Sequence, residues 1–595
     1  MPAVTYRCGG AEATVSVPDA RFLLTDGRGG YLALGGATNY DGWYATAPDG
    51  HRWKILYDIA PTSRIDAMEL DDNAVTRRAG DTLQELRVSD RGVSMRGEGQ
   101  FLLTLDCKRQ YDESDQGRIY AISATAPAGG GLPNSVARVT TLTVAYAKYL
   151  DGRIAPDTAT SMLHVGIATT FTLERRESWR EVRYPYDHRR GTRSTPWVRD
   201  VAFLTGKGEL AMALGADARD ARRKAIDLLM RPPRDAPLRL PPRVAAATLP
   251  VRLAWRSLSA LRTPTGILAG LPWFFQEWSR DELVSCGAFI AAGERDAAIR
   301  IVDKWYRAVR QDGTLPAIHP DRGWKSADAP GWLGRRTLDL IATGPVPESM
   351  LIVWRDAAAR LIGGLDVRDG LVWSGRNETW MDTASGDDGR AGARIEVQAL
   401  ALALLGAHAA LCERTGAPEP DRALQATILA AVRSRLIEGG LVIDGLAADG
   451  TPDRVARPNV FLAWYAWPEL AKVEEWCASF WRVIERLWRG WGGLASIDPA
   501  DPRYRDSDTG EDVAAYHRGD SWYFVNAIAA MALRAVDPDG SGPAARQLIV
   551  GIERDMLSQG YLGHVSEISS AGTQEAMGCH AQAWSAACYL EAMLR

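Results

Sequence analysis

A proline-rich stretch at residues 231–243, R-P-P-R-D-A-P-L-R-L-P-P-R, separates two parts of the chain that have different hydrophobic patterns. Proline lacks an N–H and restricts the preceding residue to extended backbone, so the helix predicted from about Ala216 to Met230 must end here. With 595 residues, the chain is also too long for one ordinary hydrophobic core. We therefore predict two domains, at residues 1–235 and 236–595.

Short runs of β-forming residues dominate the first part, from Val15 to about Leu210. Turn-forming residues such as those from Ala128 to Gly131 separate the runs, a pattern that predicts many short strands. Clear examples are F-L-L-T (22–25), Q-F-L-L-T-L (100–105) and V-T-T-L-T-V-A-Y (139–146). We expect an N-terminal antiparallel β-sandwich.

The glycine-rich segment D-G-R-G-G-Y-L-A-L-G-G at 26–36 is a candidate nucleotide-binding loop. Such a loop opens a helix and is followed by an acidic residue about 20 positions later. Here the next residues, A-T-N-Y-D-G-W-Y, predict a turn and another strand instead. We therefore predict a glycine-rich β-turn and no cofactor.

The second part has the hydrophobic periodicity of helices, joined by loops rich in glycine, proline and aspartate. It holds roughly twelve candidate helices. Clear candidates span 281–293, 295–310, 347–362, 395–413, 420–436, 470–489, 521–536, 543–557 and 580–594. The periodicity predicts an all-α domain but not the arrangement of its helices.

Composition narrows the class of protein. The chain has 70 basic and 74 acidic residues, a formal charge of -4, and no long block of like charge, so a neutral substrate is expected rather than nucleic acid. No run reaches the roughly 18 apolar residues of a membrane helix, and M-P-A-V-T-Y-R-C does not begin a signal peptide. We expect a cytoplasmic protein without membrane partners, whose seven scattered cysteines are reduced and mostly buried. The oligomeric state is not predicted.

Tryptophan is frequent, at 21 residues, and unevenly distributed. Seventeen tryptophans follow residue 241, and only four precede it: Trp43, Trp53, Trp179 and Trp197. An indole ring offers a broad apolar platform and one N–H donor, which suits the C–H faces of sugars. Core packing explains any single tryptophan more simply, but sugar binding explains the asymmetry.

An acidic turn in the second domain, N-E-T-W-M-D-T-A-S-G (377–386), contains the candidate general acid, Asp382. Catalytic groups concentrate in such loops. The candidate partner is Glu567 in G-H-V-S-E (563–567). Two carboxylates flanking a sugar suffice for glycoside hydrolysis, one protonating the leaving oxygen and the other acting as base or nucleophile. Further loops that combine aromatic and charged residues lie at 271–282, 312–328, 457–464, 516–522 and 578–585.

Six motifs follow one another in the second domain: A-G-L-P-W-F with W-S-R-D (269–281), T-W-M-D (379–382), R-I-E-V-Q-A-L (394–400), R-P-N (457–459), Y-H-x-G-x-S-W (516–522), and S-E with G-C-x-A-Q-A-W-S (566–585). In the first domain, F-L-L-T-D-G-R-G-G-Y (22–31) joins them. This series resembles archaeal-type glycogen debranching enzymes, the amylo-alpha-1,6-glucosidases of glycoside hydrolase family 133, and more distantly glucoamylases.

The resemblance implies a β-sandwich followed by an (α/α)6 barrel, with Asp382 as general acid and Glu567 as general base of an inverting hydrolase. It implies that Arg280 and Asp281 hold the hydroxyls of a terminal glucose. The other implied substrate-binding residues are Trp273, Trp278, Trp380, Glu396, His517, Trp522 and Gln582. The implied activity is release of glucose from α-1,6 branch points of glycogen or limit dextrin, without 4-alpha-glucanotransferase activity.

The chemistry adds two expectations about these carboxyl groups. An acid must hold its proton, so we expect Trp380 and other apolar rings to raise the pKa of Asp382 above about 3.9. Glu567 should stay ionised, and the two carboxyl groups should lie roughly 6.5 to 9.5 Å apart to admit a water molecule.

Several alternatives stay open at this stage. Asp387 and Asp388 are rival acids, Arg280 with Asp281 fits a plain ion pair at a helix start, and the helix dipole alone favours Glu396. Three histidines lack metal-ligand spacing, so hydrogen bonding is expected and no metal: His517, His564 and His580. The alternative functions are a glucoamylase-like α-1,4 exo-glucosidase, a phosphorylase, and an α-glucan-binding protein with a decayed site.

Overall fold

The computed structural model describes residues 1–35, 38–125, 139–149, 159–192, 194–233, 238–384, 388–418, 420, 422–506 and 513–595. The chain forms two compact units. The first comprises Met1–Arg239, Arg262–Pro264 and Tyr561–Gly563, and the second comprises Leu240–Leu261, Thr265–Gly560 and His564–Arg595. The turn predicted at 128–131 and the boundary predicted after residue 235 lie outside the described residues.

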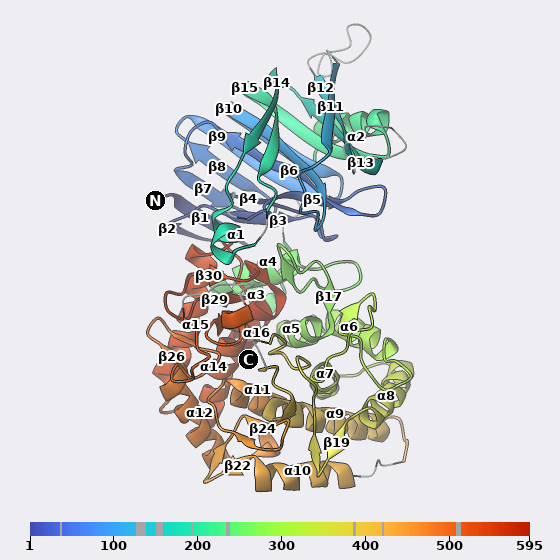
Figure 1. Cartoon of the computed structure of the whole chain (residues 1–595), viewed down its shortest axis with the longest axis vertical. Helices are drawn as coiled ribbons and strands as arrows, with labels where there is room; N and C mark the ends of the chain where they lie inside the picture. Colours follow the sequence, from blue (N-terminus) through green and yellow to red (C-terminus); the bar gives the residue numbers. More distant parts are fainter. Residues whose placement is uncertain are drawn as a thin grey trace. The chain divides into compact units, whose positions relative to one another are not determined.

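The first unit is built on one 15-stranded sheet (Figure 1). Its strands are β1 (Ala3–Cys8), β2 (Ala11–Ser16), β3 (Phe22–Thr25), β4 (Tyr31–Leu34), β5 (Gly42–Thr46), β6 (Arg52–Pro61), β7 (Ala67–Leu70), β8 (Val75–Ala79), β9 (Thr82–Ser89), β10 (Gly92–Arg109), β11 (Arg118–Thr125), β12 (Thr140–Tyr149), β13 (Ala159–Thr169), β14 (Thr172–Glu181) and β15 (Trp197–Gly215). The three clear runs of the sequence fall in β3, β10 and β12, as predicted.

Two long antiparallel strands, β10 and β15, organise this sheet. Strand β10 pairs with β9 along residues 92–98 and with β6 along 101–109. Strand β15 likewise pairs with β14 along 197–205 and with β13 along 210–215. The sheet therefore branches on both sides of this central pair. It is mixed rather than antiparallel throughout, because β1 pairs with β7 in parallel.

Helix α2 (Ala218–Met230) lies against this sheet, where a helix was predicted. Small residues on both sides let the helix approach closely, among them Ala168 and Ala225. A Cβ on Gly166 would lie 2.1 Å from the backbone oxygen of Ala221, so this position admits only glycine. The short helix α1 (Pro185–Arg190) completes the unit.

The second unit is helical. Its described residues form twelve helices of eight residues or more: α4 (Leu249–Ala260), α5 (Ser279–Ala292), α6 (Arg295–Arg307), α7 (Ala329–Thr343), α8 (Glu348–Gly363), α9 (Ile395–Arg414), α10 (Ala423–Arg435), α11 (Asn459–Ala466), α12 (Val473–Leu487), α14 (Tyr523–Val536), α15 (Gly542–Ser558) and α16 (Ala583–Leu594). Three shorter ones are α3 (Pro242–Ala245), α13 (Val513–Tyr516) and the 3-10 helix η2 (Pro468–Leu470).

Short strands pair between the loops of this unit. They are β16 (Gly270–Leu271), β17 (Glu277–Trp278), β18 (Ile318–His319), β19 (Val367–Arg368), β20 (Leu371–Val372), β21 (Gly392–Arg394), β22 (Ile437–Glu438), β23 (Leu441–Val442), β24 (Gly445–Ala447), β25 (Pro452–Asp453), β26 (Trp488–Arg489), β27 (Gly493–Leu494), β28 (Ser521–Trp522), β29 (Ile568–Ser569), β30 (Ala576–Met577) and β31 (Ala581–Gln582).

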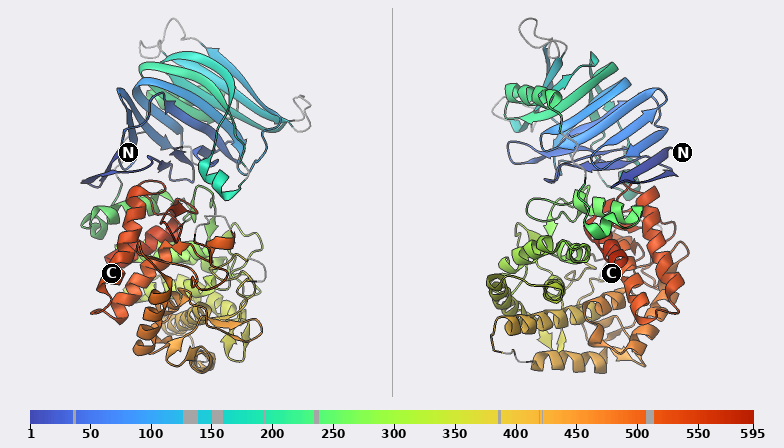
Figure 2. Two further views of the ribbon diagram at one scale, coloured as in Figure 1. Left: turned by 60° about the vertical axis from the view of Figure 1, so that its left-hand side comes forward. Right: turned by 180° about the vertical axis from the view of Figure 1, so that it is seen from behind.

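The helices alternate between an inner and an outer ring (Figure 2). Helices α5, α7, α9, α11, α14 and α16 pack against one another in that order, and α16 packs against α5 to close the inner ring. Helices α4, α6, α8, α10, α12 and α15 pack outside it. Six such pairs form the (α/α)6 arrangement that the resemblance implies.

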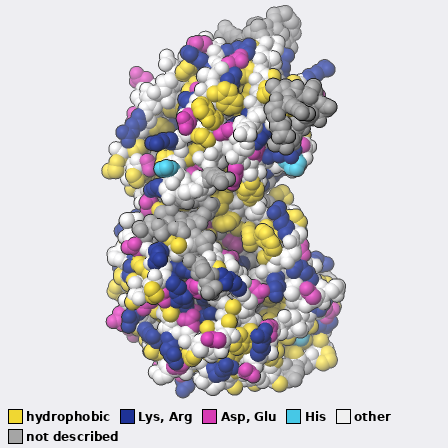
Figure 3. All heavy atoms as spheres, viewed as in Figure 1, with side chains coloured by type: hydrophobic (Ala, Val, Ile, Leu, Met, Phe, Trp, Pro, Cys, Tyr) yellow, Lys and Arg dark blue, Asp and Glu magenta, His cyan; other side chains and the backbone are white. Residues whose placement is uncertain are grey.

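The inner helices α9, α11, α14 and α16 consist mostly of apolar residues and are buried over most of their length, as expected of helices in a core. Among the described residues, α9 is the one helix both long and apolar enough to cross a membrane, contrary to the expectation that no run reaches that length. It packs against α7, α8 and α11, and 78% of its apolar window is buried, as in a core helix. Six of the seven cysteines are also buried. Basic and acidic side chains alternate over the face shown in Figure 3.

Periodicity missed three helices, α4, α7 and α11, each of which begins next to a proline. Residues 457–464, predicted as a loop, are helical from Asn459 onward. Helix α7 also contains Gly331 and Gly334, where an added Cβ would lie within about 2.5 Å of Leu400 and Leu404 in α9. These glycines therefore permit close helix packing rather than marking a loop.

Candidate active site

The beginnings of the inner helices supply the side chains of one site. Arg280 and Asp281 lie in the first turn of α5, Trp522 caps α14, and Gln582 caps α16. The loop that carries Asp382 lies between β20 and β21. The closed ring therefore gathers residues that are 300 positions apart in sequence, because its inner helices all begin at the same end.

These side chains line a pocket of about 650 Å³. Nine of the eleven predicted site residues line it: Trp273, Trp278, Arg280, Asp281, Trp380, Asp382, Trp522, Glu567 and Gln582. The volume is typical of a site for a small molecule or a few sugar units. Aromatic rings form much of the wall, and Trp380 packs edge-on against Trp522 with ring centroids 5.3 Å apart.

Asp382 is held by two cationic or polar partners. Nη1 of Arg280 donates to its Oδ2 at 3.0 Å, and Nε2 of His517 lies 3.4 Å from its Oδ1. Arg280 is fixed in turn by Asp328, at 2.8 Å, and by the backbone oxygen of Thr379. The Asp382 side chain nevertheless remains 35% exposed. Its carboxyl group is therefore oriented by the protein and open to the pocket.

Glu567 is almost fully buried, and both of its carboxyl oxygens accept hydrogen bonds. The hydroxyl of Tyr516 donates to Oε1, and the backbone N–H of Cys579 donates to Oε2 at 3.0 Å. Gly578 adopts a φ of +63°, and a Cβ there would lie 2.3 Å from Oε2. The position of the carboxyl group thus depends on the absence of a side chain at residue 578.

The pKa values of the two carboxyl groups differ in the direction opposite to expectation. Desolvation raises the pKa of Asp382, but His517 and the charge of Arg280 outweigh it and hold the pKa below its ordinary value. Burial raises the pKa of Glu567 to about 8, although Tyr516 and Cys579 lower it. The expectation that apolar rings raise the pKa of Asp382 was therefore wrong. It considered Trp380 but not the ion pair with Arg280.

Two predicted substrate-binding residues do not line the pocket. Glu396 is fully buried and accepts a hydrogen bond from Nη1 of Arg390 at 2.7 Å. His517 is also buried, and its ring stacks on Trp522 with centroids 4.8 Å apart. Each side chain is covered by protein, so the structure does not place either of them in contact with the pocket, contrary to the prediction.

The pocket lining also includes residues that were not predicted, among them Tyr516, Trp584 and Trp324. Tyr516 and Trp584 line the pocket, although both belong to motifs quoted for the resemblance. Trp324 also lines it, is 54% exposed, and lies 6.0 Å from Trp278 between ring centroids. An aromatic residue in the charged loop at 312–328 was the available signal for Trp324. The motif at 516–522 contains Tyr516 but did not show that its hydroxyl would bind Glu567, 51 residues away.

The rival acids and the metal site can be placed as well. Asp387 lies outside the described residues. Asp388 accepts a hydrogen bond from Nε of Arg518 at 3.0 Å, pairs with Arg503, and does not line the pocket. Within the described ranges, no group of three or more His, Cys, Asp or Glu side chains is placed to hold a metal ion.

A closed ring of six helical pairs with two carboxyl groups in an aromatic pocket defines a glycoside hydrolase of glucoamylase-like fold. The family model described as amylo-alpha-1,6-glucosidase matches residues 255–591, more than half of the chain. The chain therefore belongs to the amylo-alpha-1,6-glucosidase family.

Solved structures resemble the chain at low sequence identity. A bacterial glucoamylase complexed with acarbose matches with a TM-score of 0.54 and 11% identity, over 97% of this chain and 95% of that one. A GH63 mannosylglycerate hydrolase from Thermus thermophilus, in complex with Tris and D-glycerate, matches with a TM-score of 0.45 and 16% identity, over 57% and 99%. The first likeness concerns the fold. The comparison with curated proteins gave no match.

Proposed function

We propose that this protein is an exo-acting hydrolase that releases glucose from α-1,6 branch points of glycogen or limit dextrin, like the archaeal-type debranching enzymes of glycoside hydrolase family 133. The observation that carries the proposal is that Asp382 and Glu567 line one aromatic pocket in a member of the amylo-alpha-1,6-glucosidase family. Arg280 and Asp281 lie beside them at the base of α5, where a terminal sugar would bind.

In the proposed reaction, Asp382 gives its proton to O6 of the main chain as the bond from C1 to O6 breaks. A water oxygen bonds to C1 from the opposite face, and Glu567 takes a proton from that water. The product is β-glucose, so the configuration inverts. The hydrogen bonds from Tyr516 and the backbone of Cys579 stabilise the carboxylate of Glu567 once its proton has left, which supports the role of base.

Burial raises the pKa of Glu567 to about 8, whereas the pKa of Asp382 is lowered, and this order favours a proton on Glu567 before substrate binds. The proton must therefore shift before reaction. A sugar that fills the pocket removes water from the partly exposed Asp382, which raises the pKa of its carboxyl group. Substrate binding thus favours the protonated acid.

The first testable consequence concerns pH. The reactive form carries one proton on the pair, so kcat/KM should fall above about pH 8, where Glu567 loses it. Burial also raises the pKa of Asp281, to about 7. We therefore expect a further change in kcat/KM near pH 7, which Asp281→Asn should remove. A fall in kcat/KM that begins near pH 4, which is about the ordinary pKa of a carboxyl group, would contradict this order of pKa values.

A second prediction concerns Trp324. Trp324→Ala should raise KM for limit dextrin by up to about tenfold, the equivalent of ~1.4 kcal/mol, because it removes a stacking surface. The change in kcat should be small, because that surface binds ground state and transition state alike. The matched control is Trp481→Ala: Trp481 lies on α12, bonds Asp537 at 2.9 Å and does not line the pocket. Equal KM values for the two variants would remove Trp324 from the site.

Substrate choice is tested by glucose release from phosphorylase-limit dextrin and from maltoheptaose. Preference for the dextrin is the expected result. Preference for maltoheptaose would make the protein a glucoamylase-like α-1,4 exo-glucosidase. Release that requires phosphate would indicate a phosphorylase, and binding without release would indicate a decayed site.

A further inference from the structure

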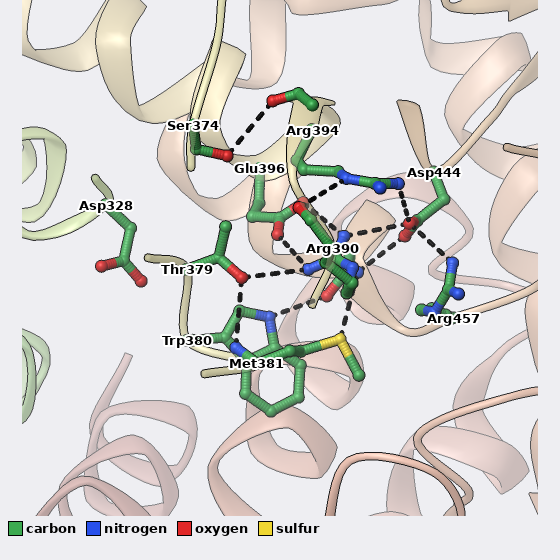
Figure 4. A network of polar contacts seen from close by, with 12 residues as sticks. Asp328, Ser374, Thr379, Trp380, Met381, Arg390, Arg394, Glu396, Asp444 and Arg457 are labelled. Carbon is green, nitrogen blue, oxygen red and sulfur yellow. Dashed lines mark hydrogen bonds and ion pairs between the residues drawn. The ribbon is translucent and has the colours of Figure 1, made fainter. Parts of the chain in front are cut away.

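Figure 4 shows a buried polar network that contacts Thr379, Trp380 and Met381, the three residues before Asp382. We call it the Arg390 network. Three arginines and three acidic residues balance its formal charge, and an amide joins them: Arg390, Arg394, Arg457, Glu396, Asp444, Asp453 and Asn459. None of these residues lines the active-site pocket. The network therefore reaches the reaction only through other side chains.

Asp444 is the centre of this network. Its Oδ2 accepts hydrogen bonds from Nη2 of Arg390 at 3.0 Å and Nη1 of Arg457 at 2.8 Å. Its Oδ1 accepts from Nδ2 of Asn459 at 2.7 Å. Because the carboxylate fixes which end of the amide donates, the Asn459 carbonyl must point away from Asp444.

The three residues that precede Asp382 each contact the network. Nη1 of Arg390 donates to Oγ1 of Thr379 at 3.2 Å. Nε1 of Trp380 donates to Oδ1 of Asn459 at 2.8 Å, and Nδ2 of Asn459 lies 3.6 Å from the sulfur of Met381. Asn459 alone thus contacts two of the three residues and connects them to the buried charges.

We propose that Asn459 is a positioning residue, whose amide, oriented by Asp444, fixes Trp380 and thereby places Asp382 for proton transfer to the leaving oxygen. This inference rests on the proposed function. Trp380 also packs edge-on against Phe524 and Trp522, and these contacts restrict the position of its indole ring. Loss of the hydrogen bond to Asn459 releases the polar edge of that ring. A shift of Trp380 then also displaces the main chain at Asp382, two residues further along the chain.

The test compares two substrates that differ in their need for an acid. Panose has an alcohol leaving group that requires a proton, whereas α-glucosyl fluoride releases fluoride without one. Asn459→Leu keeps the side-chain volume and removes both hydrogen bonds. We expect kcat on panose to fall by about 10²-fold, as for a small displacement of a catalytic group, and the rate on the fluoride to fall much less. Equal losses on both substrates would overturn the proposal.

Asn526→Leu is the matched control. Asn526 is another buried asparagine, which bonds the backbone N–H of Leu494 at 3.2 Å and the hydroxyl of Ser521, and it does not touch residues 379–382. Its loss should affect both substrates in equal proportion. Unaltered protein that turns over neither substrate would refute the proposed function itself, whereas active protein with equal losses in Asn459→Leu refutes only the positioning role.

An exchange variant covers the case in which Asn459→Leu does not fold. Asn459→Asp with Asp444→Asn keeps one amide and one carboxylate at the two positions, and an acceptor for Trp380 remains. The double variant should recover panose turnover relative to either single variant, while the fluoride rates change little. Losses that simply multiply would contradict the proposal.

Discussion

Asp382→Asn is expected to lower the rate of glucose release from limit dextrin by about 10²- to 10⁴-fold, the contribution usual for a general acid. Hydrolysis of α-glucosyl fluoride should persist, because fluoride leaves without a proton. Arg280 keeps its hydrogen bonds to Asp328 and to the Thr379 backbone, so the pocket should remain intact. The measurement is kcat on both substrates, with thermal unfolding to confirm the fold.

Asp388→Asn is the control for this variant. Asp388 lies six residues further along the chain, pairs with Arg518 and Arg503, and does not line the pocket. Its rates should stay close to those of the unaltered protein. If Asp382→Asn behaves like Asp388→Asn on dextrin, Asp382 has no role in proton transfer.

Glu567→Gln is expected to lower turnover of both substrates, again by about 10²- to 10⁴-fold, because each reaction needs an activated water molecule. Glutamine preserves the volume and an acceptor for Tyr516 but cannot take a proton. Glu553→Gln is the matched control, since Glu553 lies on α15, accepts a hydrogen bond from Tyr589 at 2.7 Å and does not line the pocket.

The pattern across the two catalytic variants separates acid from base. Asp382→Asn should spare the fluoride and Glu567→Gln should not. The opposite pattern would exchange the two roles, in line with the order of pKa values that favours a proton on Glu567 before substrate binds. Loss of both substrates in both variants would leave the pair essential and its roles unassigned.

Much of the fold could be predicted from local patterns. Hydrophobic patterns with periods of two and 3.6 residues located three strands, the β-rich character of the first unit and nine helices of the second, because the burial of one face depends on residues that are near in sequence. They failed at α7, where Pro330 and Gly331 resemble loop signals. Gly331 instead permits close packing on Leu400 of α9, a residue 69 positions away in the sequence. The parallel pairing of β1 with β7 is non-local in the same way.

Predictions about the site were limited in the same way, because local motifs do not show contacts between distant residues. Motifs indicated which residues gather in the pocket, but not which neighbours they would meet. The pKa of Asp382 is decided by Arg280, 102 residues earlier, and His517, 135 residues later. Glu396 sits in a matching motif and yet bonds Arg390 in the buried network, because its helix turns that face away from the pocket. Residue type is local information, whereas protonation and exposure are set by the fold.

The most direct test of the account is the anomer of the first glucose released from phosphorylase-limit dextrin, followed by NMR before mutarotation. Hydrolysis with Asp382 as acid and Glu567 as base to a water molecule predicts β-glucose. Initial release of α-glucose would mean a covalent intermediate with the enzyme, and would contradict the proposed inverting mechanism.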